Sequence, residues 1–183
     1  MDLAVYETLA DDVYGYIEKT CIDDVGVYRV PGSNDEAIAV YQQYLAGQRV
    51  DLAATLKDPM TATTLLKYAM THATAQLIPD SLYPVFRSAL YIKEQTGQVP
   101  ARILRKGLAL IPERNRAILT KFVRHLKTVS EHKDANQMGM INLLIVFGPS
   151  MLHAYNEDPL EEMRANPAIL KMLFDEIVAT NQM

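Results

Sequence analysis

The chain has 183 residues, 49% of them hydrophobic, which suits one ordinary domain with a buried core. Its net charge of −4 gives no support for nucleic-acid binding. No apolar run approaches the ~20 residues that span a bilayer, and the first residues lack a basic region followed by a long apolar stretch, so we expect a soluble, unsecreted, cytoplasmic protein with no integral membrane segment.

The first half of the chain predicts helices around one short loop. Residues 3–19 carry an apolar spine at helical spacing, and a loop over 23–32 follows. Ser33 with Glu36 three residues on forms a capping box, so 33–46 is predicted to be a helix that stops at Gly47.

The second half shows the same helical periodicity. Asp80, Pro100 and Pro112 mark helix starts, and Gly97 marks an end. The clearest apolar stripe runs from Asn115 to His132. Two further boundaries are expected: Gly148-Pro149 as the end of a helix, and Asn166-Pro167 as the start of the last one. No segment alternates apolar and polar residues long enough to predict a sheet, so the fold class is all-α.

The single cysteine and the four histidines favour a protein without catalytic chemistry of its own. Cys21 cannot form an internal disulfide, and a lone cysteine in apolar sequence is more often a small buried hydrophobe than a nucleophile. The histidines have no metal-ligand spacing, and the known enzyme signatures are absent. We expect a protein that binds or assists another molecule and that has no metal or cofactor of its own.

Basic residues are concentrated between Ala101 and Lys133, and acidic residues predominate after them. A solvated helix surface explains the basic stretch better than a patch that steers an acidic partner, although both interpretations remain open.

Three polar residues do not follow the pattern of their surroundings. Arg29 lies in the short loop, between Tyr28 and Val30, which we expect to hold the loop from either side, and before a Pro-Gly turn. Lys67 lies in a mostly apolar helix, where it either extends its ammonium to solvent or makes a buried polar contact. Asn142 interrupts the most apolar helix, so its amide is either satisfied internally or faces a partner.

These features and their surroundings resemble the Rho GTPase-activating protein (RhoGAP) domain over about 13–152. The loop Val25-Gly26-Val27-Tyr28-Arg29-Val30-Pro31-Gly32-Ser33 resembles the family's arginine-finger loop, and Leu65-Leu66-Lys67 resembles its lysine-bearing helix. Residues 112–132 are similar to its next long helix, and 136–149, with Asn136, Asn142 and Phe147-Gly148-Pro149, are the most specific block.

The resemblance implies a single RhoGAP-like helical bundle over residues 1–183 and a role for each marked residue. Arg29 would be the catalytic finger inserted into a GTP-loaded Rho, Rac or Cdc42-like small GTPase. Lys67 would support the finger loop or contact the GTPase, Asn142 would contact the GTPase, and Asn136 and Pro149 would shape that surface. The domain would act as a GTPase activator in trans rather than as an enzyme, because GTP and Mg²⁺ belong to the partner. Membrane recruitment through the partner is a further expectation.

The chain departs from the family pattern after Lys67. Thr71 stands where the family has an arginine on the same helix face, and the segment that follows, through Leu77, is also altered. The resemblance implies that loss of this charge would affect the affinity for the GTPase, or the choice of GTPase, more than the finger itself. The alternative function is therefore a catalytically weak or inactive RhoGAP-like module that binds the GTPase as an effector or scaffold. A helical scaffold without a GTPase partner is a third interpretation.

Overall fold

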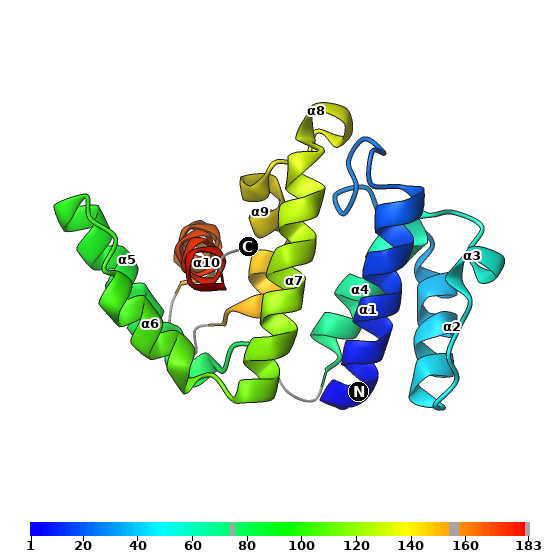
Figure 1. Cartoon of the computed structure of the whole chain (residues 1–183), viewed down its shortest axis with the longest axis horizontal. Helices are drawn as coiled ribbons and strands as arrows, with labels where there is room; N and C mark the ends of the chain where they lie inside the picture. The colour runs from blue at the N-terminus through cyan, green and yellow to red at the C-terminus, as the bar shows by residue number, and fades with distance from the viewer. Residues whose placement is uncertain (74–75, 154–157, 182–183) are drawn as a thin grey trace. The chain divides into compact units, whose positions relative to one another are not determined.

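The computed structural model describes residues 1–73, 76–153 and 158–181, and over these ranges every regular element is a helix (Figure 1). The all-α prediction is therefore confirmed. The elements are α1 (Leu3–Thr20), α2 (Asn34–Leu45), α3 (Leu52–Thr55), α4 (Met60–Thr71), a 3₁₀ turn η1 (Asp80–Leu82), α5 (Tyr83–Thr96), α6 (Ala101–Leu110), α7 (Glu113–Glu131), α8 (Lys133–Asn136), α9 (Met140–Met151) and α10 (Pro159–Asn181).

The described residues form two compact units. Unit 1 contains residues 1–73 and 128–139, and unit 2 contains 76–127, 140–153 and 158–181. Each unit is described by itself below. The expectation of one domain over residues 1–183 stays a prediction.

In unit 1, α4 packs against both α1 and α2 (Figure 1). The apolar spine predicted for the first helix forms the buried face of α1, where Leu9, Val13 and Ile17 are fully buried. Leu65 and Leu66 of α4 are also fully buried. Burial of these side chains stabilises the unit by about 1.5 to 3 kcal/mol each relative to exposure.

In unit 2, α10 packs against α5, α6 and α9. Phe122 of α7 meets Phe147 and Phe174 edge to face, with ring centroids 4.9 and 6.1 Å apart. Helices α5 and α6 pack closely at Gly107 of α6, where an added Cβ would be 2.4 Å from the ring of Phe86 of α5.

Several predicted helix ends are confirmed by their capping geometry. Ser33 is the N-cap of α2, and its hydroxyl accepts a hydrogen bond from the Glu36 amide at 3.3 Å. Gly97 follows α5 with a φ of 71°, the left-handed conformation that favours glycine after a helix.

Two predicted boundaries at proline are wrong. Pro149 lies inside α9, which continues to Met151, and Pro167 lies inside α10, which begins at Pro159. Proline removes one backbone hydrogen bond and crowds the preceding turn, but buried residues follow each proline, among them Met151 after Pro149 and Ile169 after Pro167. Packing of these residues outweighs the local penalty. No helix in the described ranges is long and apolar enough to cross a membrane.

Candidate functional site

The arginine loop, residues 21–33, connects α1 to α2 in unit 1. Tyr28 has a φ of 69°, and its side chain is fully buried. Arg29, the next residue, is exposed, and its amide donates a hydrogen bond to the Gly26 carbonyl at 2.7 Å. Since non-glycine residues rarely adopt positive φ, the buried Tyr28 ring determines the direction in which the loop turns and leaves Arg29 at the surface.

The expectation that Tyr28 and Val30 hold the loop from either side is right only for Tyr28. Val30 is 44% exposed, so it contributes little buried area. Its amide instead closes the tight turn by donating to the Gly26 carbonyl at 2.8 Å. Gly26 has a φ of 81°, which explains the need for glycine at this position.

Lys67 makes a polar contact with the loop. Its Nζ donates a hydrogen bond to the Tyr28 carbonyl at 2.9 Å, and burial lowers the pKa of Lys67 from its usual value. Of the two alternatives for this lysine, the structure supports the partly buried polar contact. The contact connects α4 directly to the residue that precedes Arg29.

Asn136 holds the other side of the loop and is fully buried. Its backbone carbonyl accepts from the Gly26 amide at 2.8 Å. Its side-chain amide donates to the carbonyls of Ile22 at 2.8 Å and Val129 at 2.9 Å, while its Oδ1 accepts from the Met138 amide at 2.8 Å. Asn136 thus joins the arginine loop, at Ile22 and Gly26, to the end of α7 and to the residues that follow α8.

Two threonines of α4, which the sequence analysis did not identify, fix the end of the loop. The Gly32 amide donates to Thr64 Oγ1 at 2.9 Å, and the Ser33 amide donates to Thr61 Oγ1 at 3.1 Å. Gly32 lies so close to α4 that an added Cβ would be 2.1 Å from the Thr61 backbone nitrogen. The available signal was the group of threonines at the start of an otherwise apolar helix.

The Arg29 side chain makes no hydrogen bond or ion pair within the part of the chain that the structure describes. Its Nη2 and Nε atoms lie 3.5 and 3.6 Å from the position that a Cβ on Gly26 would occupy. Arginine is permanently charged at physiological pH. The loop therefore presents at the surface a guanidinium whose charge no neighbouring carboxylate neutralises.

The other predicted site residues are exposed. The Thr71 hydroxyl donates to its own helix, at 3.2 Å to the Lys67 carbonyl and 2.9 Å to the Tyr68 carbonyl. Residues 74–75 of the altered segment lie outside the described residues. In unit 2, Asn142 and Pro149 are both exposed on α9. The structure thus brings Arg29, Lys67 and Asn136 together around one loop in unit 1, with Thr71 one helical turn beyond Lys67.

Asn142 has exposed apolar neighbours on α9. Ile141 is 50% exposed and Ile145 is 55% exposed. Asn142 therefore lies on an exposed part of α9 that also carries apolar side chains.

Cys21 is the buried side chain that its apolar sequence suggests. Cys21 is buried, and burial raises the pKa of its thiol to about 11, so it is not a nucleophile at neutral pH. Among the described residues, no group of three or more His, Cys, Asp or Glu side chains could hold a metal ion.

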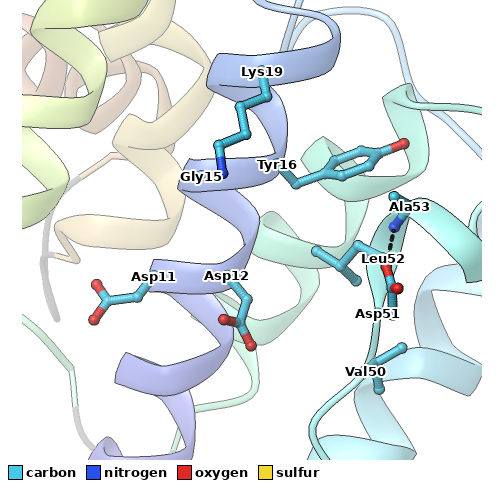
Figure 2. Close-up of a pocket in the computed structure, with 9 residues that line it drawn as sticks. All are labelled: Asp11, Asp12, Gly15, Tyr16, Lys19, Val50, Asp51, Leu52 and Ala53. Atoms are coloured by element: carbon cyan, nitrogen blue, oxygen red, sulfur yellow. Dashed lines mark hydrogen bonds between the residues drawn. The ribbon is translucent and has the colours of Figure 1, made fainter.

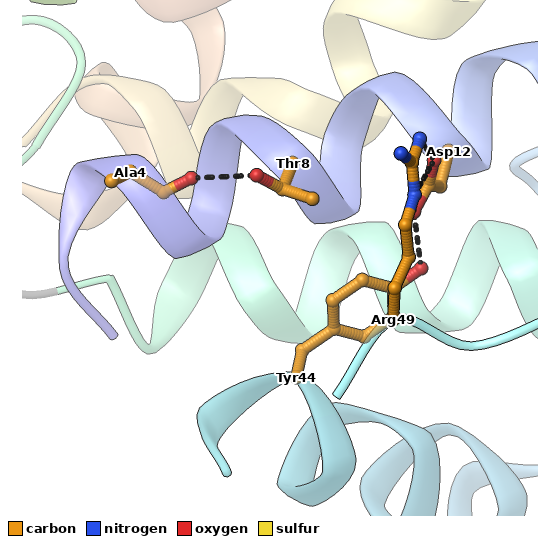
Figure 3. A network of polar contacts seen from close by, with 5 residues as sticks. All are labelled: Ala4, Thr8, Asp12, Tyr44 and Arg49. Carbon is orange, nitrogen blue, oxygen red and sulfur yellow. Dashed lines mark hydrogen bonds and ion pairs between the residues drawn. The ribbon is translucent and has the colours of Figure 1, made fainter. Parts of the chain in front are cut away.

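A separate pocket of about 380 Å³ lies on unit 1 between α1 and residues 50–53 (Figure 2). Two of the three carboxylates that line it make contacts within the protein. Asp51 accepts from the Ala53 amide at 3.0 Å, and Asp12 accepts from the Tyr44 hydroxyl at 2.8 Å and pairs with Arg49 (Figure 3). No predicted site residue lines this pocket. We interpret the Asp12 network as a connection between α1 and the segment after α2.

Sequence comparison identifies a protein family and several relatives that resemble this chain. The RhoGAP domain pattern matches residues 9–156 of the chain. Rho GTPase-activating protein gacN of Dictyostelium discoideum is 25% identical over 165 residues, which cover 88% of this chain and 26% of that protein. Rho GTPase-activating protein gacY of the same organism is 30% identical over 137 residues, covering 75% of this chain and 19% of that protein. The chain therefore spans only a minor part of these relatives.

Solved structures show a similar fold. The BH domain from GRAF, the GTPase regulator associated with focal adhesion kinase, matches with a TM-score of 0.84 and 18% identity, covering 100% of this chain and 98% of that one. Human Rho GTPase activating protein 15 matches with a TM-score of 0.82 and 23% identity, covering 93% and 82%. At these identities the likeness concerns the fold, and the predicted type of helical bundle is confirmed.

Proposed function

Because the chain belongs to the RhoGAP domain family, we propose that it binds a GTP-loaded Rho-family small GTPase and accelerates GTP hydrolysis by inserting Arg29 into the partner's active site. The observation that carries the proposal is the exposed, uncompensated guanidinium of Arg29 on a loop whose backbone is fixed on both sides. Rho, Rac and Cdc42-like proteins are the candidate partners.

The chemistry of phosphoryl transfer explains what Arg29 contributes. Negative charge is spread over the oxygens of the transferring phosphoryl group in the transition state, and a planar guanidinium can donate to two of them at once. An arginine supplied in trans raises the rate of GTP hydrolysis by roughly 10³ to 10⁵ in GTPases of known mechanism, which corresponds to about 4 to 7 kcal/mol.

The loop reduces the conformational freedom that Arg29 would lose on insertion. Lys67 binds the Tyr28 carbonyl, Asn136 binds the Gly26 amide, and Thr64 binds the Gly32 amide, so the backbone is fixed both before and after Arg29. Only the side chain then remains to be ordered in the complex, and this lowers the entropic cost of reaching the transition state.

In this mechanism the domain is an activator, and the hydrolytic chemistry takes place in the partner. GTP and Mg²⁺ are bound by the GTPase, and the domain supplies charge and shape without a cofactor of its own. Asn142 and Pro149 would contact the GTPase from α9, with Ile141 and Ile145 as apolar contacts beside Asn142. We propose that the domain works in the cytoplasm and meets membranes through its partner.

Single-turnover GTP hydrolysis by a panel of Rho, Rac and Cdc42-like GTPases tests this function. The wild-type domain is expected to accelerate hydrolysis by at least one of them, and Arg29→Ala to remove about 10³-fold or more of that acceleration. Arg29→Lys is the matched variant, since it keeps the charge but loses the planar donor geometry, and it should restore little activity. Absence of acceleration across the panel would refute the proposal.

A second candidate, binding of the GTPase without activation, is favoured by Thr71. Its hydroxyl is used within α4 and supplies no charge to a partner. This candidate predicts that the domain captures GTP-loaded GTPase in a pull-down while turnover stays at the intrinsic rate. Thr71→Arg would then increase affinity, or restore turnover if the missing arginine alone limits the activity.

A further inference from the structure

His132 and Asp23 connect the arginine loop to the start of the turn around α8. The His132 Nδ1 lies 2.8 Å from Asp23 Oδ1, although the residues are 109 positions apart in the sequence. Since a carboxylate only accepts, the ring nitrogen is the donor. Both side chains are exposed, at 41% for His132 and 66% for Asp23.

The turn around α8 consists of residues 132–136. The contact between His132 and Asp23 lies at the first residue of this turn, and Asn136, its last residue, also binds the loop. His132 is the N-cap residue of α8, but its side chain makes no capping hydrogen bond with that helix. At the end of α8, Asn136 binds the backbone of Ile22 and Gly26. The two ends of the turn therefore contact the loop at consecutive residues, Ile22 and Asp23, and then at Gly26.

We propose that Asp23 and His132 form a positioning pair that keeps the arginine loop in its finger-presenting conformation. The pair acts through the backbone of Gly26. The Gly26 amide donates to the Asn136 carbonyl, and the Gly26 carbonyl accepts from the amides of Arg29 and Val30. A shift of the loop relative to α8 would thus be transmitted to Arg29 through one residue. The catalytic consequence rests on the proposed function, whereas the conformational consequence does not.

The expected effect is modest, because exposed pairs are worth little. Coupling between exposed charged side chains amounts to a factor of about two to five in an equilibrium constant. We expect loss of the pair to increase opening of the loop by this factor. The maximal GTPase-activating rate follows the fraction of molecules whose loop is closed, so it should fall by no more than this factor, while the concentration of GTPase needed for half-maximal rate stays unchanged.

Hydrogen exchange of the Gly26 amide in the free domain is the first test. Asp23→Ala and His132→Ala are each expected to increase its exchange rate by about two- to five-fold, and the double variant to have no larger effect than either single one. His132→Asn should restore protection, because its side-chain amide can donate from nearly the same place as Nδ1. Asp24→Ala is the matched control: Asp24 is an exposed neighbouring carboxylate without a side-chain hydrogen bond or ion pair among the described residues.

Single-turnover activation by the same variants is the second test. A positioning role is supported if the maximal rate is reduced in Asp23→Ala and His132→Ala and restored in His132→Asn. The melting temperature should stay unchanged in all three variants. Unchanged Gly26 exchange in both alanine variants, or equal effects from Asp24→Ala, would overturn it. If exchange changes as expected but the wild-type domain activates no GTPase, the pair positions the loop and the proposed function is the part that fails.

Discussion

Substitution of Gly32 by alanine should separate the arginine loop from α4. The added Cβ would lie 2.1 Å from the Thr61 nitrogen, 2.4 Å from the Met60 carbonyl carbon and 2.5 Å from the Thr61 Cα. These are backbone atoms within a helix, so no side-chain rotation can relieve the contact. The loop must move away, and the hydrogen bonds from Gly32 and Ser33 to the two threonines must lengthen.

The magnitude follows from the cost of overpacking. Forcing extra volume into a closely packed site costs about 1 to 3 kcal/mol, and the strained hydrogen bonds place Gly32→Ala near the upper end. For a domain of this size we expect the melting temperature to fall by roughly 5 to 10 °C. GTPase activation should also decrease, because the loop that carries Arg29 is displaced.

Gly15→Ala is the matched control for this experiment. Gly15 lies within α1 and has no atom within 4 Å of an added Cβ. Alanine is favoured over glycine inside a helix by about 0.5 to 1 kcal/mol, so this variant should be more stable than wild type. Thermal unfolding of both variants, followed by circular dichroism, provides the measurement. Equal or higher stability of Gly32→Ala would contradict the inferred contact between the loop and α4.

Three further predictions concern single side chains of unit 1. Lys67→Met removes the hydrogen bond to the Tyr28 carbonyl, so we expect GTPase activation to fall by about 10- to 100-fold. The melting temperature should change little, because the same substitution removes the cost of burying the ammonium. An unchanged maximal rate would contradict this prediction. Asn136→Ala leaves the Ile22 carbonyl without its donor and the Met138 amide without its acceptor, so it should lower the free energy of unfolding by about 2 to 5 kcal/mol in urea titration. A loss below about 1 kcal/mol would argue against these bonds. Burial raises the pKa of Cys21 from 9.0 to about 11, so folding favours the protonated thiol. The contribution of this thiol to stability is complete below pH 9 and declines between pH 9 and 11. Alkylation of Cys21 at pH 8 should be far slower in the native protein than in the unfolded chain.

Local sequence was sufficient to predict that the fold is helical and to predict those helix ends that depend on neighbouring residues. The apolar periodicity of α1 and the capping box at Ser33 both act within a few residues, so they can be read directly from the chain. Arg29, Lys67 and Asn136 were identified through family resemblance, and their hydrogen bonds became known only from the structure.

The prolines show where local rules are insufficient. Pro149 and Pro167 disfavour continuation of a helix, yet α9 and α10 continue through them because buried side chains beyond each proline contribute more than one lost hydrogen bond.

The geometry of the arginine loop depends almost entirely on contacts that are distant in the sequence. Gly32 reads as a turn residue, but its lack of a side chain is needed for the approach of α4. The sequence around Asp23 indicates a solvated loop carboxylate, but Asp23 contacts His132, the residue that follows α7. The sequence alone thus determined that this chain is helical, and the resemblance of its loop indicated Arg29 as the candidate finger. Tertiary structure decided how that arginine is held, because such contacts join segments whose local patterns carry no information about one another.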